Sequence, residues 1–160
     1  FLGGGEMIRR VGIERSSYAA PPHRFEAGTP AIGPVIGMGA AAAWLMRQDW
    51  TALAEHELRL TGRLLDGLSA MPAVRLYGPA GLQGRLGVIA FAVEGIHAHD
   101  VCQMLDGHGV ALRGGHHCAQ PLMDRFDVAA TARASLAPYN DDADVDALLE
   151  GLEDTMRRLA

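Results

Sequence analysis

The sequence contains no lysine, so all 14 of its basic side chains other than histidine are arginines. The glycine run at residues 3–5 therefore lacks the Gly-Lys-Ser/Thr ending of a phosphate-binding P-loop. The formal net charge is −5, and the arginines form no stripe along the chain. A general nucleic-acid binder needs a basic surface, so we expect no nucleic-acid partner.

Cysteine is also scarce, because Cys102 and Cys118 are the only two. A domain of this size does not need a disulfide, so we expect free thiols in a reducing, cytoplasmic environment. The longest apolar stretch, residues 31–46, is too short and too rich in alanine and glycine to cross a bilayer, and no signal-peptide layout is visible. We therefore expect no membrane partner. The start at Phe1, directly in a glycine-rich segment, predicts an internal fragment of a larger protein.

The length of 160 residues gives room for about one domain with a sizeable core. Residues 1–30 show little periodicity and much glycine and proline. After them the pattern predicts helices at 30–48, 50–71, 99–107, 121–126 and from 141 onward, and strands at 74–77, 87–93, 110–113 and 131–137. This order predicts an α+β fold: a small, mostly antiparallel sheet with helices packed on one face.

The start of the first helix has a recognisable capping pattern. Thr29 supplies a hydroxyl at the position before the helix, and Pro30 suits its first turn. Because the amide groups at a helix start attract anions, Thr29 is also placed to face a phosphate.

Cys118 is the candidate reactive group of the sequence. It follows Arg113, His116 and His117 at a predicted turn from strand to helix, and nearby cations favour a reactive thiolate. Alternatively, Cys118 could be a small buried hydrophobic residue. For Cys102, which lies inside a predicted helix, we favour this second interpretation. Adjacent side chains on an extended chain point to opposite faces, and no spacing typical of a zinc site is present, so we expect no metal site.

Four segments carry a resemblance to a known family: residues 1–8 (FLGGGEMI), 24–30 (RFEAGTP), 113–121 (RGGHHCAQP) and 131–135 (TARAS). In order and spacing, the chain resembles the C-terminal part of SufS-type (group II) cysteine desulfurases. These are class V members of the fold type I enzymes that use pyridoxal 5'-phosphate (PLP). The resemblance implies that residues 1–30 are a remnant of the large PLP-binding domain and residues 31–160 the C-terminal small domain.

The resemblance also implies a reaction and its residues. Family members convert L-cysteine to L-alanine, leave a persulfide on a cysteine of the enzyme, and pass the sulfur to an acceptor protein for iron–sulfur cluster assembly. The resemblance implies Cys118 as that nucleophile and Arg133 as the group that binds the substrate carboxylate, a role that suits a guanidinium. It implies Arg113 and His116 as residues that line the entrance to the site.

Cofactor contacts follow from the same resemblance. Thr29 and Gly3 match residues that reach the PLP phosphate of the partner subunit in a homodimer. The family's Schiff-base lysine, the aspartate facing the pyridine nitrogen and the histidine stacked on the ring match no residue here, because they lie upstream of Phe1. Since the chain has no lysine, we expect the parent protein to be active and this fragment to be inactive.

Three alternatives stay open at this point. The parent protein could be a selenocysteine lyase or a cysteine sulfinate desulfinase on the same scaffold. The chain could also be a non-catalytic module for binding or dimerisation.

Overall fold

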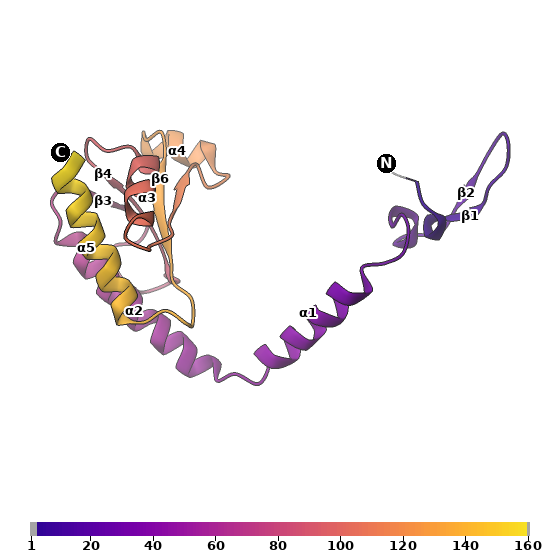
Figure 1. Ribbon diagram of the computed structural model, residues 1–160, viewed down its shortest axis with the longest axis horizontal. Coiled ribbons are helices and arrows are strands. Elements are labelled where there is room, and N and C mark those ends of the chain that lie inside the picture. Colours follow the sequence, from indigo (N-terminus) through magenta and orange to yellow (C-terminus); the bar gives the residue numbers. More distant parts are fainter. Residues whose placement is uncertain (1–2, 160) are drawn as a thin grey trace. The chain divides into compact units, whose positions relative to one another are not determined.

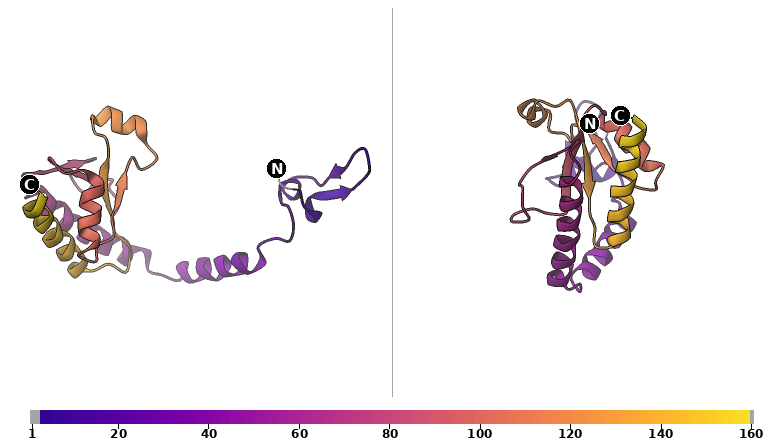
Figure 2. Two further views of the ribbon diagram at one scale, coloured as in Figure 1. Left: turned by 45° about the horizontal axis from the view of Figure 1, so that its top comes forward. Right: turned by 90° about the vertical axis from the view of Figure 1, so that its left-hand side faces the viewer.

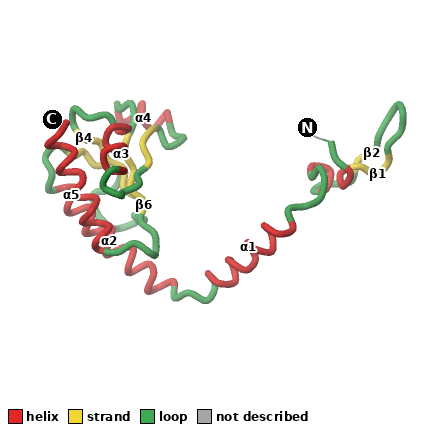
Figure 3. Tube along the Cα trace, viewed as in Figure 1, coloured by secondary structure: helices red, strands yellow, loops and turns green. Residues whose placement is uncertain are grey.

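The computed structural model describes residues 3–159, so Phe1 and Leu2 of the first motif, and Ala160, lie outside the described residues. The chain divides into two compact units, residues 1–48 and 49–160. The helices and strands of each unit are distinguished by colour in Figure 3. The division between these two units falls after residue 48. The boundary predicted after residue 30, between a large and a small domain, stays a prediction.

The first unit has more local structure than its lack of periodicity indicates. Strands β1 and β2 form a short antiparallel hairpin in which Ile8 is paired with Tyr18. Two or three residues per strand are too few to show an alternating pattern, which is why the sequence did not predict this hairpin. The elements of this unit are two 3-10 turns, the hairpin strands and one helix: η1 Gly5–Met7, β1 Ile8–Arg10, β2 Ser17–Tyr18, η2 His23–Phe25 and α1 Ile32–Leu45.

The predicted cap of the first helix is wrong. Helix α1 begins at Ile32, its N-cap residue is Ala31, and no side chain caps it. The Ile32 amide donates to the Pro30 carbonyl at 2.8 Å, which closes a tight turn before the helical hydrogen bonds begin at Ala31. Thr29 therefore lies outside the helix, and the argument that placed it at a helix start for phosphate binding no longer applies.

The second unit follows the predicted order of elements. The strand predicted at residues 110–113 is wrong in position, because the strand starts at Arg113 and pairs from there with β6. Residues 110–112 are apolar for a different reason: Val110 and Leu112 pack against the core. The elements are α2 Trp50–Ser69, β3 Val74–Tyr77, β4 Val88–Val93, α3 Ala98–Asp106, β5 Arg113–Gly115, α4 Gln120–Phe126, β6 Thr131–Ser135 and α5 Asp142–Leu159.

The sheet of the second unit has the strand order β3-β4-β6-β5, and every adjacent pair is antiparallel (Figure 1). Alternate residues of the two central strands point to one face and are buried: Ile89, Phe91, Val93, Ala132 and Ala134. Helices α2, α3 and α5 pack beside the sheet (Figure 2). Their apolar residues share one core with those of the strands: Leu60, Leu64, Leu68, Val101, Leu105, Val145, Leu148 and Leu152. This arrangement confirms the predicted α+β fold with an antiparallel sheet and helices packed on one face.

The other face of the sheet, which we call the second face, carries a different set of side chains. One row of paired residues crosses the four strands: Tyr77, Ala90, Arg133 and Arg113. Because these positions alternate with those of the core residues along each strand, they lie on the opposite face. Phe126 of α4 lies against Tyr77, with ring centroids 5.1 Å apart. The segment between β5 and β6 is therefore held at this face and not at the helical one.

No helix among residues 3–159 is long and apolar enough to cross a membrane.

Truncation of a core residue tests the assignment of the two faces. Phe91 is fully buried, so Phe91→Ala is expected to lower the free energy of unfolding by about 3–5 kcal/mol through lost burial and a cavity. Val88 lies on the same strand, points to the second face and is 43% exposed, so Val88→Ala is expected to lower it by less than about 1 kcal/mol. Urea denaturation of both variants, followed by circular dichroism, measures the difference. Equal losses would contradict the placement of the core.

Candidate functional site

The turn between β5 and α4 presents Cys118 to solvent. His117 and Cys118 are consecutive non-glycine residues with positive φ angles, 55° and 60°, and Gly115 has a φ of 133°. A positive φ at a residue with a Cβ costs on the order of 1–3 kcal/mol and persists only where the surroundings hold it. The thiol is thus displayed by a backbone conformation that the rest of the site must stabilise.

A cavity of about 500 Å³ opens at this turn. Its lining consists almost entirely of the motif that resembled the desulfurases: Arg113, Gly114, Gly115, His116, His117, Cys118, Gln120 and Pro121. Among residues 3–159, no group of three histidine, cysteine or acidic side chains is arranged to hold a metal ion.

Arg113 is in direct contact with the cysteine. Its Nη2 atom donates a hydrogen bond to the Cys118 Sγ atom over 3.6 Å, a distance that suits the larger sulfur atom. The resemblance implied that Arg113 lines the entrance to the site, and the structure adds a contact between Arg113 and the Cys118 thiol.

Arg133 lies directly opposite Arg113, because the two residues are partners in the β5–β6 pairing. Like charges in such a pair repel each other. Within residues 3–159 neither arginine forms an ion pair with a carboxylate, and the buried Nε atom of Arg133 has no hydrogen-bond partner. Arg113 contacts the Cys118 thiol, whereas Arg133 is the strand partner of Arg113 and is not among the residues that line the cavity at the turn. Guanidinium groups without a carboxylate partner are suited to bind a small carboxylate.

His117 is turned inward and His116 is exposed. The Nε2 atom of His117 lies 3.0 Å from the Thr131 carbonyl oxygen and 2.9 Å from the Thr131 hydroxyl. Burial lowers the pKa of His117, and the charges of Arg133, Arg113 and His116 lower it further, against the hydrogen bond to Thr131, which raises it. The ring is therefore neutral near pH 7. Nothing in the sequence separates these two adjacent histidines, so the role of His117 was missed.

Gly114 allows helix α3 to approach the strand that leads to the turn. A Cβ at this position would lie 3.1 Å from the Cys102 Sγ atom and 3.2 Å from the Ala98 carbonyl oxygen. Cys102 packs against the core, as predicted, and burial raises the pKa of its thiol. The two cysteines are thus distinct in kind: one is part of the core, and Cys118 is exposed beside a guanidinium.

The two predicted phosphate contacts belong to the first unit. A Cβ at Gly4 would lie 2.5 Å from the Gly28 backbone nitrogen, so Gly4 packs against the backbone of Ala27 and Gly28. Gly3 and Thr29 are the sequence neighbours of Gly4 and Gly28, and both are exposed. A phosphate held by both residues is compatible with this local arrangement.

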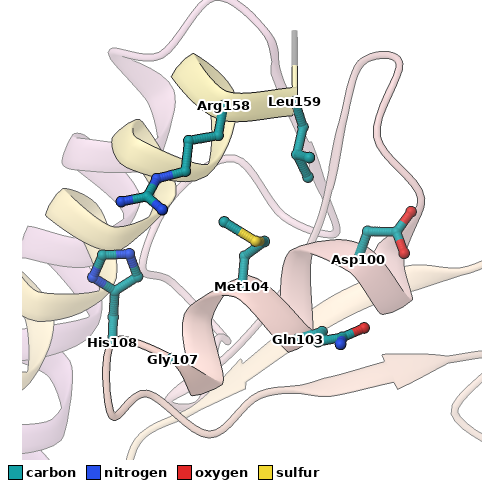
Figure 4. Close-up of a pocket in the computed structure, with 7 residues that line it drawn as sticks. All are labelled: Asp100, Gln103, Met104, Gly107, His108, Arg158 and Leu159. Carbon is teal, nitrogen blue, oxygen red and sulfur yellow. The ribbon is translucent and has the colours of Figure 1, made fainter.

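A second hollow of about 550 Å³ lies between α3 and the end of α5 (Figure 4). It contains the side chains of His108 and Arg158. The His108 Nε2 atom lies 3.1 Å from the Asp154 carboxylate, and the Arg158 guanidinium forms an ion pair with the same carboxylate at 2.7 Å. It also contains no cysteine, serine or threonine among its lining residues. Its charges are compensated within the protein, unlike those of Arg113 and Arg133, so we assign the functional site to the Cys118 turn.

Residues 1–148 match the family model of the aminotransferase class-V proteins. The chain therefore belongs to this family. It is 49% identical over 152 residues to a cysteine desulfurase of Klebsiella pneumoniae, a match that spans 94% of this chain and 37% of that protein.

Solved structures agree with this assignment. The cysteine desulfurase CsdA from Escherichia coli superposes with a TM-score of 0.84 and 36% identity over 100% of this chain and 39% of that one. A mutant of C-DES with glycine covalently linked to its PLP cofactor superposes with a TM-score of 0.65 over 96% of this chain and 37% of that one. At 22% identity it shows the shared fold alone. The chain spans less than two fifths of the length of these relatives.

The lowered pKa of His117 predicts how stability depends on pH. The unfolded chain takes up a proton near the ordinary histidine pKa of 6.5, while the folded protein resists that proton until a lower pH. The free energy of unfolding should therefore fall as the pH drops from about 7.5 through this window. His117→Gln should lose less stability over the same range.

Urea denaturation at several pH values between about 7.5 and 5 measures this dependence. His99→Gln, which removes an exposed histidine outside the site, serves as the control and should keep the wild-type dependence. An identical decline in His117→Gln and wild type would contradict the assignment.

Proposed function

We propose that this chain is the C-terminal part of a PLP-dependent cysteine desulfurase. In this proposal residues 1–30 belong to the large PLP-binding domain and residues 31–160 form the small domain of a homodimeric, cytoplasmic enzyme. The observation that supports it best is the exposed Cys118 thiol, 3.6 Å from Arg113, beside the uncompensated pair of Arg113 and Arg133.

The geometry suggests a role for each side chain in the proposed reaction. Arg133 binds the carboxylate of L-cysteine through its guanidinium group. The Cys118 thiolate, stabilised by Arg113, forms an S–S bond to the substrate sulfur while the bond between that sulfur and the substrate Cβ breaks. The carbon keeps the bonding electron pair and takes up a proton, so alanine leaves and a persulfide stays on Cys118. An acceptor protein then removes the sulfur for iron–sulfur cluster assembly.

The cofactor proposal divides between this chain and the rest of the protein. Gly3 and Thr29 would hold the PLP phosphate of the partner subunit, a role supported by the close packing of the neighbouring Gly4 against the backbone of Ala27 and Gly28. PLP supplies an electron sink for the carbon that bears the substrate amino group. The chain contains no lysine to bind the cofactor covalently, so we also propose that it is inactive alone. His116 keeps its proposed place at the entrance to the site.

Replacement of the nucleophile tests the proposal. In the full-length protein, Cys118→Ala is expected to lower release of alanine from L-cysteine by more than about 100-fold, because the proposed nucleophile is removed and Cys102 packs against the core. Cys102→Ala is the matched control and should keep wild-type turnover, since Cys102 belongs to the core.

A substrate panel completes this test. Alanine release from L-cysteine by Cys118→Ala at wild-type rates would contradict the proposed nucleophile. Wild-type preference for selenocysteine or cysteine sulfinate over L-cysteine would replace the proposed substrate.

Replacement of the carboxylate-binding arginine tests the substrate site. Arg133→Gln is expected to lower kcat/KM for L-cysteine by about 10–100-fold, because charge-assisted hydrogen bonds to the carboxylate are lost. Arg75→Gln removes a guanidinium from another strand of the same face and should leave kcat/KM within about twofold. Steady-state kinetics of the full-length variants measure both values. An equal decrease in the two variants would point to a general effect of surface charge.

A further inference from the structure

The backbone of the Cys118 turn requires an anchor. His117 and Cys118 both have positive φ angles, a conformation that residues with a Cβ seldom adopt, and two in succession are rarer still. The turn is closed by a single short backbone contact, from the Ala119 amide to the His116 carbonyl at 2.9 Å. Some further interaction must select this conformation over the ordinary ones.

The side chain of His117 provides that interaction. Its Nε2 atom is within hydrogen-bond distance of both the carbonyl oxygen and the hydroxyl of Thr131. Thr131 is completely buried at the start of β6 and is paired with Gly115, so it is fixed in the sheet. A carbonyl oxygen can only accept a hydrogen bond, so Nε2 carries the hydrogen and donates it. The turn is thereby tied to an inner strand of the sheet.

The second ring nitrogen of His117, Nδ1, carries no hydrogen, so the anchoring side chain is neutral. The Nδ1 atom of His117 is buried and has no partner among residues 3–159. Protonation of Nδ1 would place a charge beside Arg113 and Arg133, which already lower the pKa of this histidine. At neutral pH the ring therefore donates one hydrogen bond without adding a positive charge to the site.

The anchor and the nucleophile are adjacent in the sequence but differ in exposure. His117 is half-buried against β6, while Cys118 is exposed and receives the hydrogen bond from Arg113. Because Arg113 precedes the turn and Thr131 follows α4, the position of Sγ relative to the guanidinium depends on both ends of the turn being fixed. Release of His117 would free the Cys118 backbone to leave the positive-φ region.

We propose that His117 is a positioning residue: the hydrogen bond from its Nε2 atom to Thr131 holds the Cys118 thiol beside Arg113 in the orientation needed for attack on the substrate sulfur. This inference rests on the proposed desulfurase function and adds a residue to it. His117 does not touch the substrate in this proposal and acts only through Cys118.

Three replacements of His117 separate its hydrogen bond from its backbone conformation. His117→Gln keeps an N–H donor at about the reach of Nε2. His117→Asn tolerates a positive φ but is too short to reach Thr131. His117→Ala removes both properties. His99→Ala, an exposed histidine outside the site, is the control.

The first measurement needs neither cofactor nor turnover. The rate of alkylation of Cys118 by iodoacetamide at pH 7 is followed by peptide mass spectrometry in the full-length protein, with Cys102 as an internal reference. His117→Ala and His117→Asn are expected to react about 5–10-fold more slowly, because the Cys118 Sγ atom is no longer held in its exposed position beside the Arg113 guanidinium. His117→Gln and His99→Ala should stay within about twofold of wild type.

The second measurement is the steady-state kinetics of the full-length protein with L-cysteine. His117→Asn is expected to lower kcat by about 10–100-fold, because a displacement on the order of 1 Å is enough for such a loss. KM should change by less than about twofold, since Arg133 still binds the carboxylate, and His117→Gln should recover most of kcat. A purely structural role would instead lower thermal stability and change both constants.

The results that would overturn the positioning role of His117 differ from those that would overturn the proposed desulfurase function. Wild-type alkylation and kcat in His117→Asn, or equal losses in His117→Asn and His117→Gln, would overturn the positioning role. A full-length wild-type protein that releases no alanine from L-cysteine would overturn the desulfurase proposal. The alkylation rates would then still decide whether His117 orients the thiol.

Discussion

The pairing of β5 with β6 is the constraint on which the candidate site depends. It sets Arg113 opposite Arg133 and Gly115 opposite Thr131. The first of these pairs brings two guanidinium groups to one face, and the second brings the turn within reach of the Thr131 side chain and carbonyl. A shift of one residue in this register would send Arg133 to the helical face, where the core is apolar.

The order of the elements in the second unit was predictable because each of them buries an apolar stripe of its own period. Strand β3 was predicted to the residue, since its short apolar run lies between Pro72 and Gly78. Strand β5 was misplaced because residues 110–112 are apolar for packing against the core and not for pairing. The cap at Thr29 was misassigned because a local sequence pattern does not show the tight turn that follows it.

The candidate site was predictable only in part. The cysteine, the arginine-rich context and the turn were visible as a motif, and the resemblance to cysteine desulfurases assigned them roles. The contact from Arg113 to Cys118 and the anchor from His117 to Thr131 were not visible. They depend on strand register and on which of two adjacent histidines turns inward, and both are set by tertiary structure.

Apolar burial on one face of the sheet offsets the unfavourable features of the candidate site on the other face. The turn contains two consecutive residues with positive φ angles, and the second face carries two like charges without acidic partners. Each of these features destabilises the folded state. The same inner strands, β4 and β6, bury Ile89, Phe91 and Ala134 on the opposite face, which offsets the loss. Tyr77 and Phe126 add an aromatic contact that fixes α4 after the turn. Because the two faces are separate, the second face can keep two guanidinium groups without carboxylate partners. In the proposed function, binding of the substrate carboxylate would relieve the repulsion between Arg113 and Arg133.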